Sequence, residues 1–327
     1  MSPGTATVRP DSPITTAAGA FVDSHRAAAE QLGARLGGLV DDPEVFVGAM
    51  LAGMVGLVDE NYRREQSRIA PGLEDSIGIR LPLLAAIRRH FDRSSLWAGP
   101  DQLLWLADRL LREQGLEVRV LAFHILTRVL PRDPERGWQL LRRAARQAHE
   151  WITVDTLAHA YGLGILLEPF RWAEIEQLAY STSRWERRLV ASTIATIPFV
   201  KRREGRQSVV AERSFPILTN LIGDADPDVQ KGLSWALRSL ARVDTAALAA
   251  FCDTQSRVAR QTDDGYRAWV IRDALPALEP LHADAIRVRL DGIRRRAGRP
   301  ATSDAATVAA RFADIASTRP LAEPPLF

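Results

Sequence analysis

A tryptophan and an aspartate stand four positions apart in the segment Glu150-Trp-Ile-Thr-Val-Asp155. If this segment is helical, Trp151 and Asp155 lie on one face, because residues four apart are neighbours on a helix surface. An indole face and a carboxylate can both stabilise a cation that develops during a reaction. The structural alternative is ordinary, since a tryptophan on an amphipathic helix usually packs in a core and an aspartate beside it usually caps the helix or forms an ion pair.

Positive charges surround another tryptophan and suit the binding of phosphate groups. Lys231 lies four residues before Trp235 and Arg238 lies three residues after it, so the three share a predicted helix face. Guanidinium and ammonium groups both bind phosphates. Other basic candidates in this region are Arg187, Arg188, Lys201, Arg202 and Arg203. Lys201, Arg202 and Arg203 follow a proline in a predicted loop, and their position there agrees equally well with contact to nucleic acid and with simple solvation.

The basic residues are unevenly distributed, although the net charge is only +3, from 43 Lys and Arg against 40 Asp and Glu. Residues 1–60 hold three arginines and eight acidic residues, whereas residues 181–242 hold eleven basic and six acidic residues. A local excess of cations is what a polyanion such as nucleic acid requires. The alternative is that a genome rich in G and C encodes arginine at ordinary exposed helix positions. The presence of lysine at positions 201 and 231 alone agrees with this alternative.

Other functional classes lack their sequence signatures. The sequence has no GxxxxGK[ST] loop, no HxxxH pair, and a single cysteine, Cys252, which cannot build a zinc site. We therefore expect neither a metal nor a cofactor. The longest apolar stretch without charge, Val45–Val58, has 14 residues, short of the roughly 18 that a membrane-spanning helix needs. The N-terminus also lacks a secretory signal, so we expect a cytoplasmic protein without a membrane segment.

The elements that must position these residues are helices. Apolar residues recur at steps of three and four over most of the sequence, for example in residues 116–130, and no alternating run bounded by hairpin turns occurs. Helix starts are marked by the pairs Asp42-Pro43, Asp133-Pro134 and Asp226-Pro227. The pattern predicts an all-α protein, an α-solenoid of degenerate HEAT-like helix pairs. Successive pairs rotate slightly in such a solenoid and leave a concave surface suited to an extended ligand.

The order of three short motifs carries a resemblance to a known family. The motifs are Trp151-x-x-x-Asp155, Trp185-x-x-Arg188 and Lys231-x-x-x-Trp235-Ala-Leu-Arg238. In this order and separation they resemble the AlkD-like DNA alkylation repair glycosylases, which are HEAT-like repeat proteins. The segment Gly78-Ile-Arg-Leu-Pro82 is similar to the one that precedes the first helix pair of that family. The resemblance covers about residues 60–280.

The resemblance implies a DNA glycosylase that hydrolyses the N-glycosidic bond of cationic N3- or N7-alkylated purines in duplex DNA. Asp155 would be the catalytic carboxylate, Trp151 and Trp235 the aromatic walls around the reacting deoxyribose, and Arg188 a contact to a backbone phosphate. The family acts without flipping the lesion into a tight pocket, which implies tolerance of bulky adducts. Two alternatives remain open, a non-catalytic solenoid that binds damaged or branched DNA and a protein-interaction scaffold.

The resemblance and the helical pattern together divide the chain into five parts. We expect a loose tail over residues 1–18 and acidic helices over 19–60. The HEAT-like catalytic domain would span 61–280, followed by C-terminal helices over 281–316 and a second tail over 317–327. The expected protein is a monomer whose partner is double-stranded DNA that carries alkylated purines.

Overall fold

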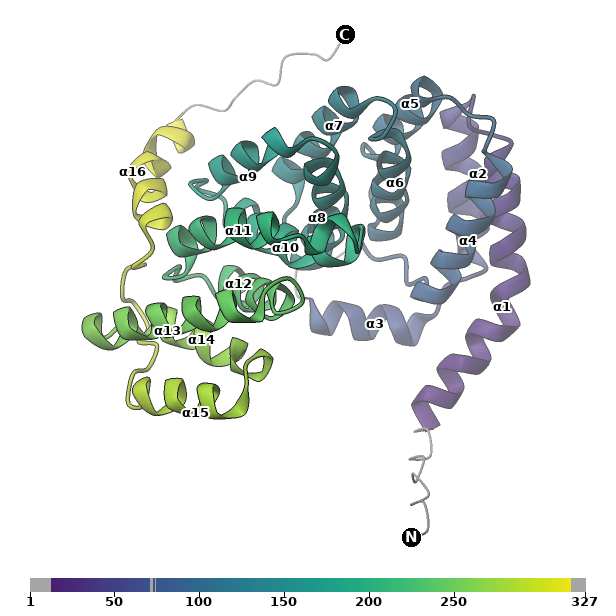
Figure 1. Ribbon diagram of the computed structural model, residues 1–327. Coiled ribbons are helices and arrows are strands. Elements are labelled where there is room, and N and C mark those ends of the chain that lie inside the picture. The colour runs from purple at the N-terminus through teal and green to yellow at the C-terminus, as the bar shows by residue number, and fades with distance from the viewer. Residues whose placement is uncertain (1–12, 71–72, 74, 319–327) are drawn as a thin grey trace. The chain divides into compact units, whose positions relative to one another are not determined.

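The computed structural model describes residues 13–70, 73 and 75–318, with the side chains of 13–15 and 312–318 excepted. The regular elements of this part are sixteen α-helices and three short 3₁₀-helices, η1 (Pro169–Arg171), η2 (Glu204–Arg206) and η3 (Leu275–Ala277) (Figure 1). Its only β-pairing is an isolated antiparallel bridge between Val58 and Ile79. The predicted all-α class is therefore confirmed. No helix within the described ranges is long and apolar enough to cross a membrane.

The helices group into two compact units, and the boundary falls between Ile125 and Leu126, inside α6 (Leu116–Val129). The helices before it are α1 (Pro13–Gly37), α2 (Pro43–Val55), α3 (Glu60–Ile69), α4 (Leu81–Ser94) and α5 (Pro100–Leu110). The helices after it are α7 (Pro134–Gln147), α8 (Trp151–Leu167), α9 (Trp172–Leu178), α10 (Arg184–Val200), α11 (Ser208–Leu221), α12 (Pro227–Leu240), α13 (Thr245–Thr262), α14 (Gly265–Ala274), α15 (Pro280–Arg289) and α16 (Asp304–Thr318).

The two predicted tails are only partly within the described residues. Helix α1 begins at Pro13, so residues 13–18 of the predicted N-terminal tail are helical, and residues 1–12 lie outside the described part. Helix α16 ends at Thr318, and residues 319–327 also lie outside it. The predicted boundary between residues 60 and 61 falls at the start of helix α3, which spans Glu60–Ile69.

Asp-Pro pairs begin three helices as the sequence predicted. The Asp42 carboxylate accepts a hydrogen bond from the Val45 N–H at the start of α2, and Asp133 does the same for the Arg136 N–H at the start of α7. Asp226 accepts from the N–H groups of the first turn of α12. In each case the proline occupies the first turn, where a missing N–H costs nothing.

In the N-terminal unit, α1 packs along α4, and α2 packs on α1 and α5. The segment that begins at Gly78 is held by a buried carboxylate, because Glu117 accepts the N–H groups of Ile77, Gly78 and Ile79 at 2.9, 2.8 and 2.9 Å. Gly78 has a φ of +96°, a conformation that favours glycine. This anchoring fixes the chain just before α4.

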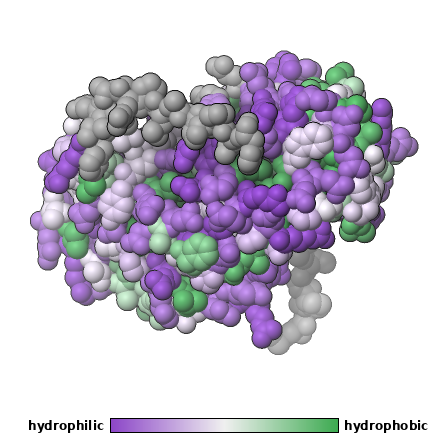
Figure 2. All heavy atoms as spheres, turned by 90° about the horizontal axis from the view of Figure 1, so that it is seen from above, coloured by the Kyte–Doolittle hydropathy of each residue, from purple (hydrophilic) through white to green (hydrophobic). Residues whose placement is uncertain are grey.

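In the C-terminal unit, α8, α10, α12 and α14 form a row in which each helix packs against the next. A second set of helices lies against the row, with α7 on α8, α9 on α10, α11 on α12 and α13 on α14. This two-layer succession of helix pairs agrees with the predicted α-solenoid. On the face drawn in Figure 2, hydrophobic residues form small groups separated by hydrophilic ones.

Candidate active site

The site is built on the first turns of α8, where Trp151 is the first helical residue. The side chain of Glu150 caps this end, since its carboxylate accepts the N–H groups of Ile152 and Thr153 at 2.6 and 2.7 Å. A side chain that satisfies two free amides fixes where the helix begins. Trp151 and Asp155 are therefore on the same face of α8, as their spacing predicted.

The Asp155 carboxylate accepts three hydrogen bonds from α10. Arg188 donates from Nε to Oδ1 at 3.0 Å and from Nη2 to Oδ2 at 2.7 Å, and Ser192 Oγ donates to Oδ1 at 2.6 Å. A bidentate guanidinium together with a hydroxyl leaves the carboxylate a single orientation. The side chain of Asp155 is nevertheless 19% exposed, whereas that of Arg188 is 6% exposed. The carboxylate can thus meet a ligand while the arginine stays covered.

Arg188 joins three helices of the row. Besides Asp155 on α8, its Nη1 donates to the backbone carbonyl of Asp228 on α12 at 2.6 Å. Its Cζ lies 5.8 Å from the centre of the Trp151 ring. Helix α12 comes close at Gly232, where an added Cβ would lie 3.4 Å from Arg188 Cγ. The Nε, Nη1 and Nη2 atoms of Arg188 each donate to a protein acceptor, and the phosphate contact that the resemblance implied remains a prediction.

Trp235 lies on α12, one turn beyond Gly232, and is half-buried like Trp151. The same helix carries Asp228, whose carbonyl accepts from Arg188. The row of helices therefore places Asp155 and Trp151 on α8 and Trp235 on α12, with Arg188 and Ser192 on α10 between them. An accessible carboxylate that shares a helix face with an indole is able to stabilise a cationic transition state.

Arg187 has surroundings unlike those of its neighbour. Its Nε donates to Asp224 Oδ2 at 2.7 Å, and its Nη1 donates to the carbonyls of Ser181 and Thr182 at 2.9 and 3.1 Å. The Asp224 side chain is 1% exposed. Protein acceptors therefore engage Arg187 at the start of α10, and its contact with DNA remains a prediction.

The remaining predicted cations are closer to solvent. Arg238 forms an ion pair with Asp273 on α14 and donates to the Asp273 carbonyl at 3.0 Å. Lys231 is exposed on α12. In the turn between α10 and η2, Lys201 is half-exposed, and Arg202 and Arg203 are exposed. Their contact with DNA remains a prediction.

The sequence pattern missed the hydroxyl of Ser192. It is fully buried and donates directly to Asp155. A signal was available, because Ser192 lies four residues after Arg188 and so shares its helix face. The cap Glu150 was equally recognisable as an acidic residue before a helix start.

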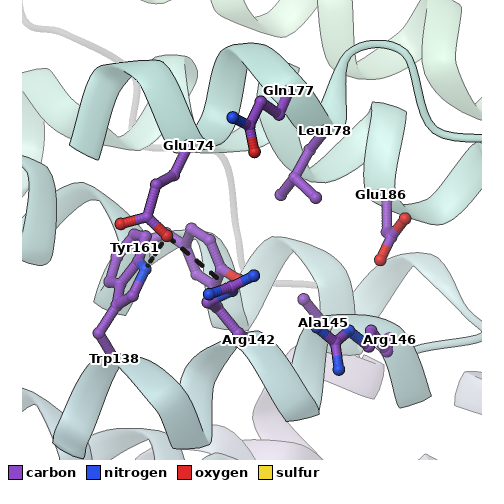
Figure 3. Close-up of a pocket in the computed structure, with 9 residues that line it drawn as sticks. All are labelled: Trp138, Arg142, Ala145, Arg146, Tyr161, Glu174, Gln177, Leu178 and Glu186. Atoms are coloured by element: carbon purple, nitrogen blue, oxygen red, sulfur yellow. Dashed lines mark hydrogen bonds and ion pairs between the residues drawn. The ribbon is translucent and has the colours of Figure 1, made fainter. Parts of the chain in front are cut away.

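A separate pocket lies between α7, α8, α9 and the start of α10 (Figure 3). Glu174 is engaged there by the Trp138 indole, whose Nε1 donates to it at 2.6 Å, and by Arg142 at 3.9 Å. The buried Tyr161 hydroxyl has no hydrogen-bond partner in the described part of the chain. Burial raises the pKa of that hydroxyl far above its ordinary value. No predicted site residue lines this pocket.

Comparison with known proteins adds evidence of a different kind. Neither the curated proteins nor the solved structures gave a significant match. Residues 52–278, which include α8, α10, α12 and every predicted site residue, match the family model described as "DNA alkylation repair enzyme". Because the match covers well over half of the sequence, the chain belongs to the family of DNA alkylation repair enzymes.

Proposed function

We propose that the protein is a DNA glycosylase that hydrolyses the N-glycosidic bond of cationic N3- or N7-alkylated purines in duplex DNA. The observation that carries the proposal is the Asp155 carboxylate, which is partly exposed and held by Arg188 and Ser192. Membership of a DNA alkylation repair family supports the same substrate class.

The chemistry needs only one carboxylate. A purine alkylated at N3 or N7 is cationic, so it leaves as a neutral base when the C1′–N bond breaks and takes the electron pair with it. The sugar left behind resembles an oxocarbenium ion, the type of cation that glycosidases also stabilise with carboxylates. Asp155 supplies the negative charge that stabilises this cation, and the indole of Trp151 adds a cation–π attraction.

The hydrogen bonds to Asp155 leave room for water. Oδ1 accepts from both Arg188 and Ser192, whereas Oδ2 accepts from Arg188 alone. A carboxylate oxygen has about two lone-pair sites, so Oδ2 retains one. A water that donates to this site would be oriented toward C1′, and its proton would pass to the carboxylate as the new C–O bond forms.

Arg188 and Ser192 act in this proposal as positioning residues. They do not touch the reacting atoms but hold the carboxylate in place before the reaction begins, which avoids the cost of reorganising a mobile charge. The second function that an observation favours is DNA binding without catalysis. An Asp–Arg ion pair between helices is also an ordinary structural feature, and the cations of α12 would serve binding alone.

Replacing Asp155 by Asn separates the two functions. Purified wild-type protein is expected to release 7-methylguanine and 3-methyladenine from methylated duplex DNA, and Asp155→Asn to lose most of that release while DNA binding persists. Asp284→Asn, which changes an exposed carboxylate on α15, is the matched control. Binding by the wild type without any base release would favour the non-catalytic function.

Tolerance of bulky lesions is a further part of the proposal and needs its own test. The support is a cationic leaving group whose own lability, rather than a fitted pocket, would give specificity. A panel of duplexes that carry methyl and larger N3 or N7 adducts is expected to show release of both kinds. Release restricted to methylated bases would limit the activity to small lesions.

A further inference from the structure

A hollow of about 510 Å³ opens beside α12 and α14, and Lys231 is the one residue of its lining that the motifs include. Its lining includes Lys231 of α12, Trp269 of α14, and Arg295 and Arg296 of the segment after α15. We call residues 294–299, with the sequence Arg-Arg-Arg-Ala-Gly-Arg, the arginine segment. It lies beyond residue 278, where the family match ends.

The arginine segment is docked on the helix row. The Tyr266 hydroxyl of α14 donates to the Arg299 carbonyl at 2.7 Å, and beyond the segment the Thr302 N–H donates to the Gly223 carbonyl at 2.9 Å. At Gly265 the backbones are so close that an added Cβ would lie 2.1 Å from the Arg294 carbonyl oxygen. These contacts at both ends hold the backbone of the arginine segment against α14.

The hollow has a positive lining. Among the described residues that line it, none is acidic. The guanidinium of Arg295 stacks on Trp269 with Cζ 4.5 Å from the ring centre, and Nη1 donates to the Gln230 amide oxygen at 2.8 Å. That acceptor is neutral, so the hydrogen bond leaves the positive charge of Arg295 uncompensated. Arg296 differs, because its Nη2 lies 3.1 Å from Asp263 Oδ2.

The hollow adjoins, along α12, the residues that hold Arg188 and thereby Asp155. Pro227, which lines the hollow, directly precedes Asp228, whose carbonyl accepts from Arg188. Lys231 in the hollow is one turn before Trp235. A polymer bound with one residue at Asp155 on α8 could thus extend past Trp235 to Lys231, both of which are on α12.

We propose that this hollow binds a backbone phosphate of the DNA strand that presents the lesion, with Arg295 and Lys231 as the main contacts. The ligand class rests on the proposed function. A guanidinium stacked on an indole keeps N–H groups free at its edge and loses little freedom when it binds a phosphate oxygen. Lys231 adds an exposed charge that has no need to break an ion pair.

The test measures binding of an undamaged duplex at several salt concentrations for the wild type, Arg295→Gln and Lys231→Gln. Each variant is expected to bind more weakly, and the slope of log K against log salt to fall by about 1 for each lost phosphate contact. Arg295→Lys keeps the charge and should retain most of the slope. The controls are Arg257→Gln and Arg287→Gln, which remove exposed arginines from α13 and α15 outside the hollow.

Unchanged affinity and slope in folded Arg295→Gln and Lys231→Gln would overturn the proposal. Lys231→Gln is included because Lys231 is exposed, so its replacement should not disturb folding. A hollow specific for small anions would instead show thermal stabilisation of the wild type by inorganic phosphate, lost in Arg295→Gln, with no change in the DNA slope. That result would also overturn the proposal.

Base release separates this inference from the proposed function. For Arg295→Gln, the concentration of methylated DNA that gives half-maximal single-turnover release is expected to rise, because the variant loses binding. A wild type without release but with a lower salt slope in Arg295→Gln would leave the hollow as a DNA contact and refute the glycosylase. Base release by the wild type with no change of the salt slope in Arg295→Gln would support the glycosylase and refute the hollow as a DNA contact.

Discussion

Two adjacent arginines on α10 form ion pairs of similar geometry in different surroundings. Arg188 Nη2 lies 2.7 Å from Asp155, and Arg187 Nε lies 2.7 Å from Asp224. The Asp155 side chain is 19% exposed, but that of Asp224 is 1% exposed. The same chemical pair is therefore open to a ligand in one place and closed in the other.

The difference between these two pairs shows what makes an ion pair available for function. The Arg187–Asp224 pair ties the start of α10 to the turn before α12, and the remaining acceptors of Arg187 are backbone carbonyls. Its loss should be felt in folding. The Arg188–Asp155 pair has one covered member and one accessible member, so its loss should be felt in base release as well as in folding.

Asp224→Asn should have the largest effect on stability. The change leaves the Arg187 charge buried without its partner, which costs about 3 kcal/mol of unfolding free energy. Chemical denaturation at low temperature measures this, and base release per folded molecule should stay close to the wild type. A loss below about 1 kcal/mol, the range of exposed pairs, would mean that the two ion pairs do not differ as their burial indicates.

Asp155→Asn should have the largest effect on base release. Removal of the charge that stabilises the sugar cation is expected to lower the single-turnover rate of base release by about 10²- to 10³-fold, the effect of losing one well-placed electrostatic group. The unfolding free energy should also fall, because Arg188, whose side chain is 6% exposed, is left without its charged partner. Loss of stability with near-normal release would assign Asp155 to structure alone.

Arg188→Lys should lower release by about tenfold, since an ammonium group cannot form the bidentate pair that orients both carboxylate oxygens. Arg188→Met should lower it further, and this graded response distinguishes positioning from a purely steric role. If Arg188→Met instead lowers the salt dependence of DNA binding and leaves the release rate unchanged, Arg188 is the phosphate contact that the resemblance implied.

Ser192→Ala should have the smallest effect. One neutral hydrogen bond to Asp155 is lost, with about 1 kcal/mol of net value, and the release rate should fall by about fivefold. Ser234→Ala removes a buried serine hydroxyl from α12 that is not bonded to Asp155 and is the control. Equal rates for the two variants would remove Ser192 from the site.

The fold and part of the site could be predicted from local patterns. Helical periodicity and the Asp-Pro starts were sufficient for the all-α class and for the common face of Trp151 and Asp155. The distinction between Arg187 and Arg188 was not accessible in this way. Consecutive residues on a helix point in different directions, and nothing within α10 says which direction meets a buried carboxylate.

The arginine segment illustrates the same limit further along the chain. The prediction included it in the C-terminal helices over residues 281–316, but the structure has an irregular segment between α15 and α16 that is docked on α12 and α14. The contact between Arg295 and Gln230 joins residues 65 positions apart. No short-range pattern encodes such a contact.

Interactions within about four residues were enough to specify where helices form and which side chains share a face, because helical hydrogen bonds and caps are local. Tertiary packing alone decided which carboxylate remains accessible and which arginine supports it. The reason is physical: the exposure of Asp155 and the position of Arg188, 33 residues further along the chain, depend on how α8, α10 and α12 pack together, and close packing is a property of the assembled row rather than of any one helix.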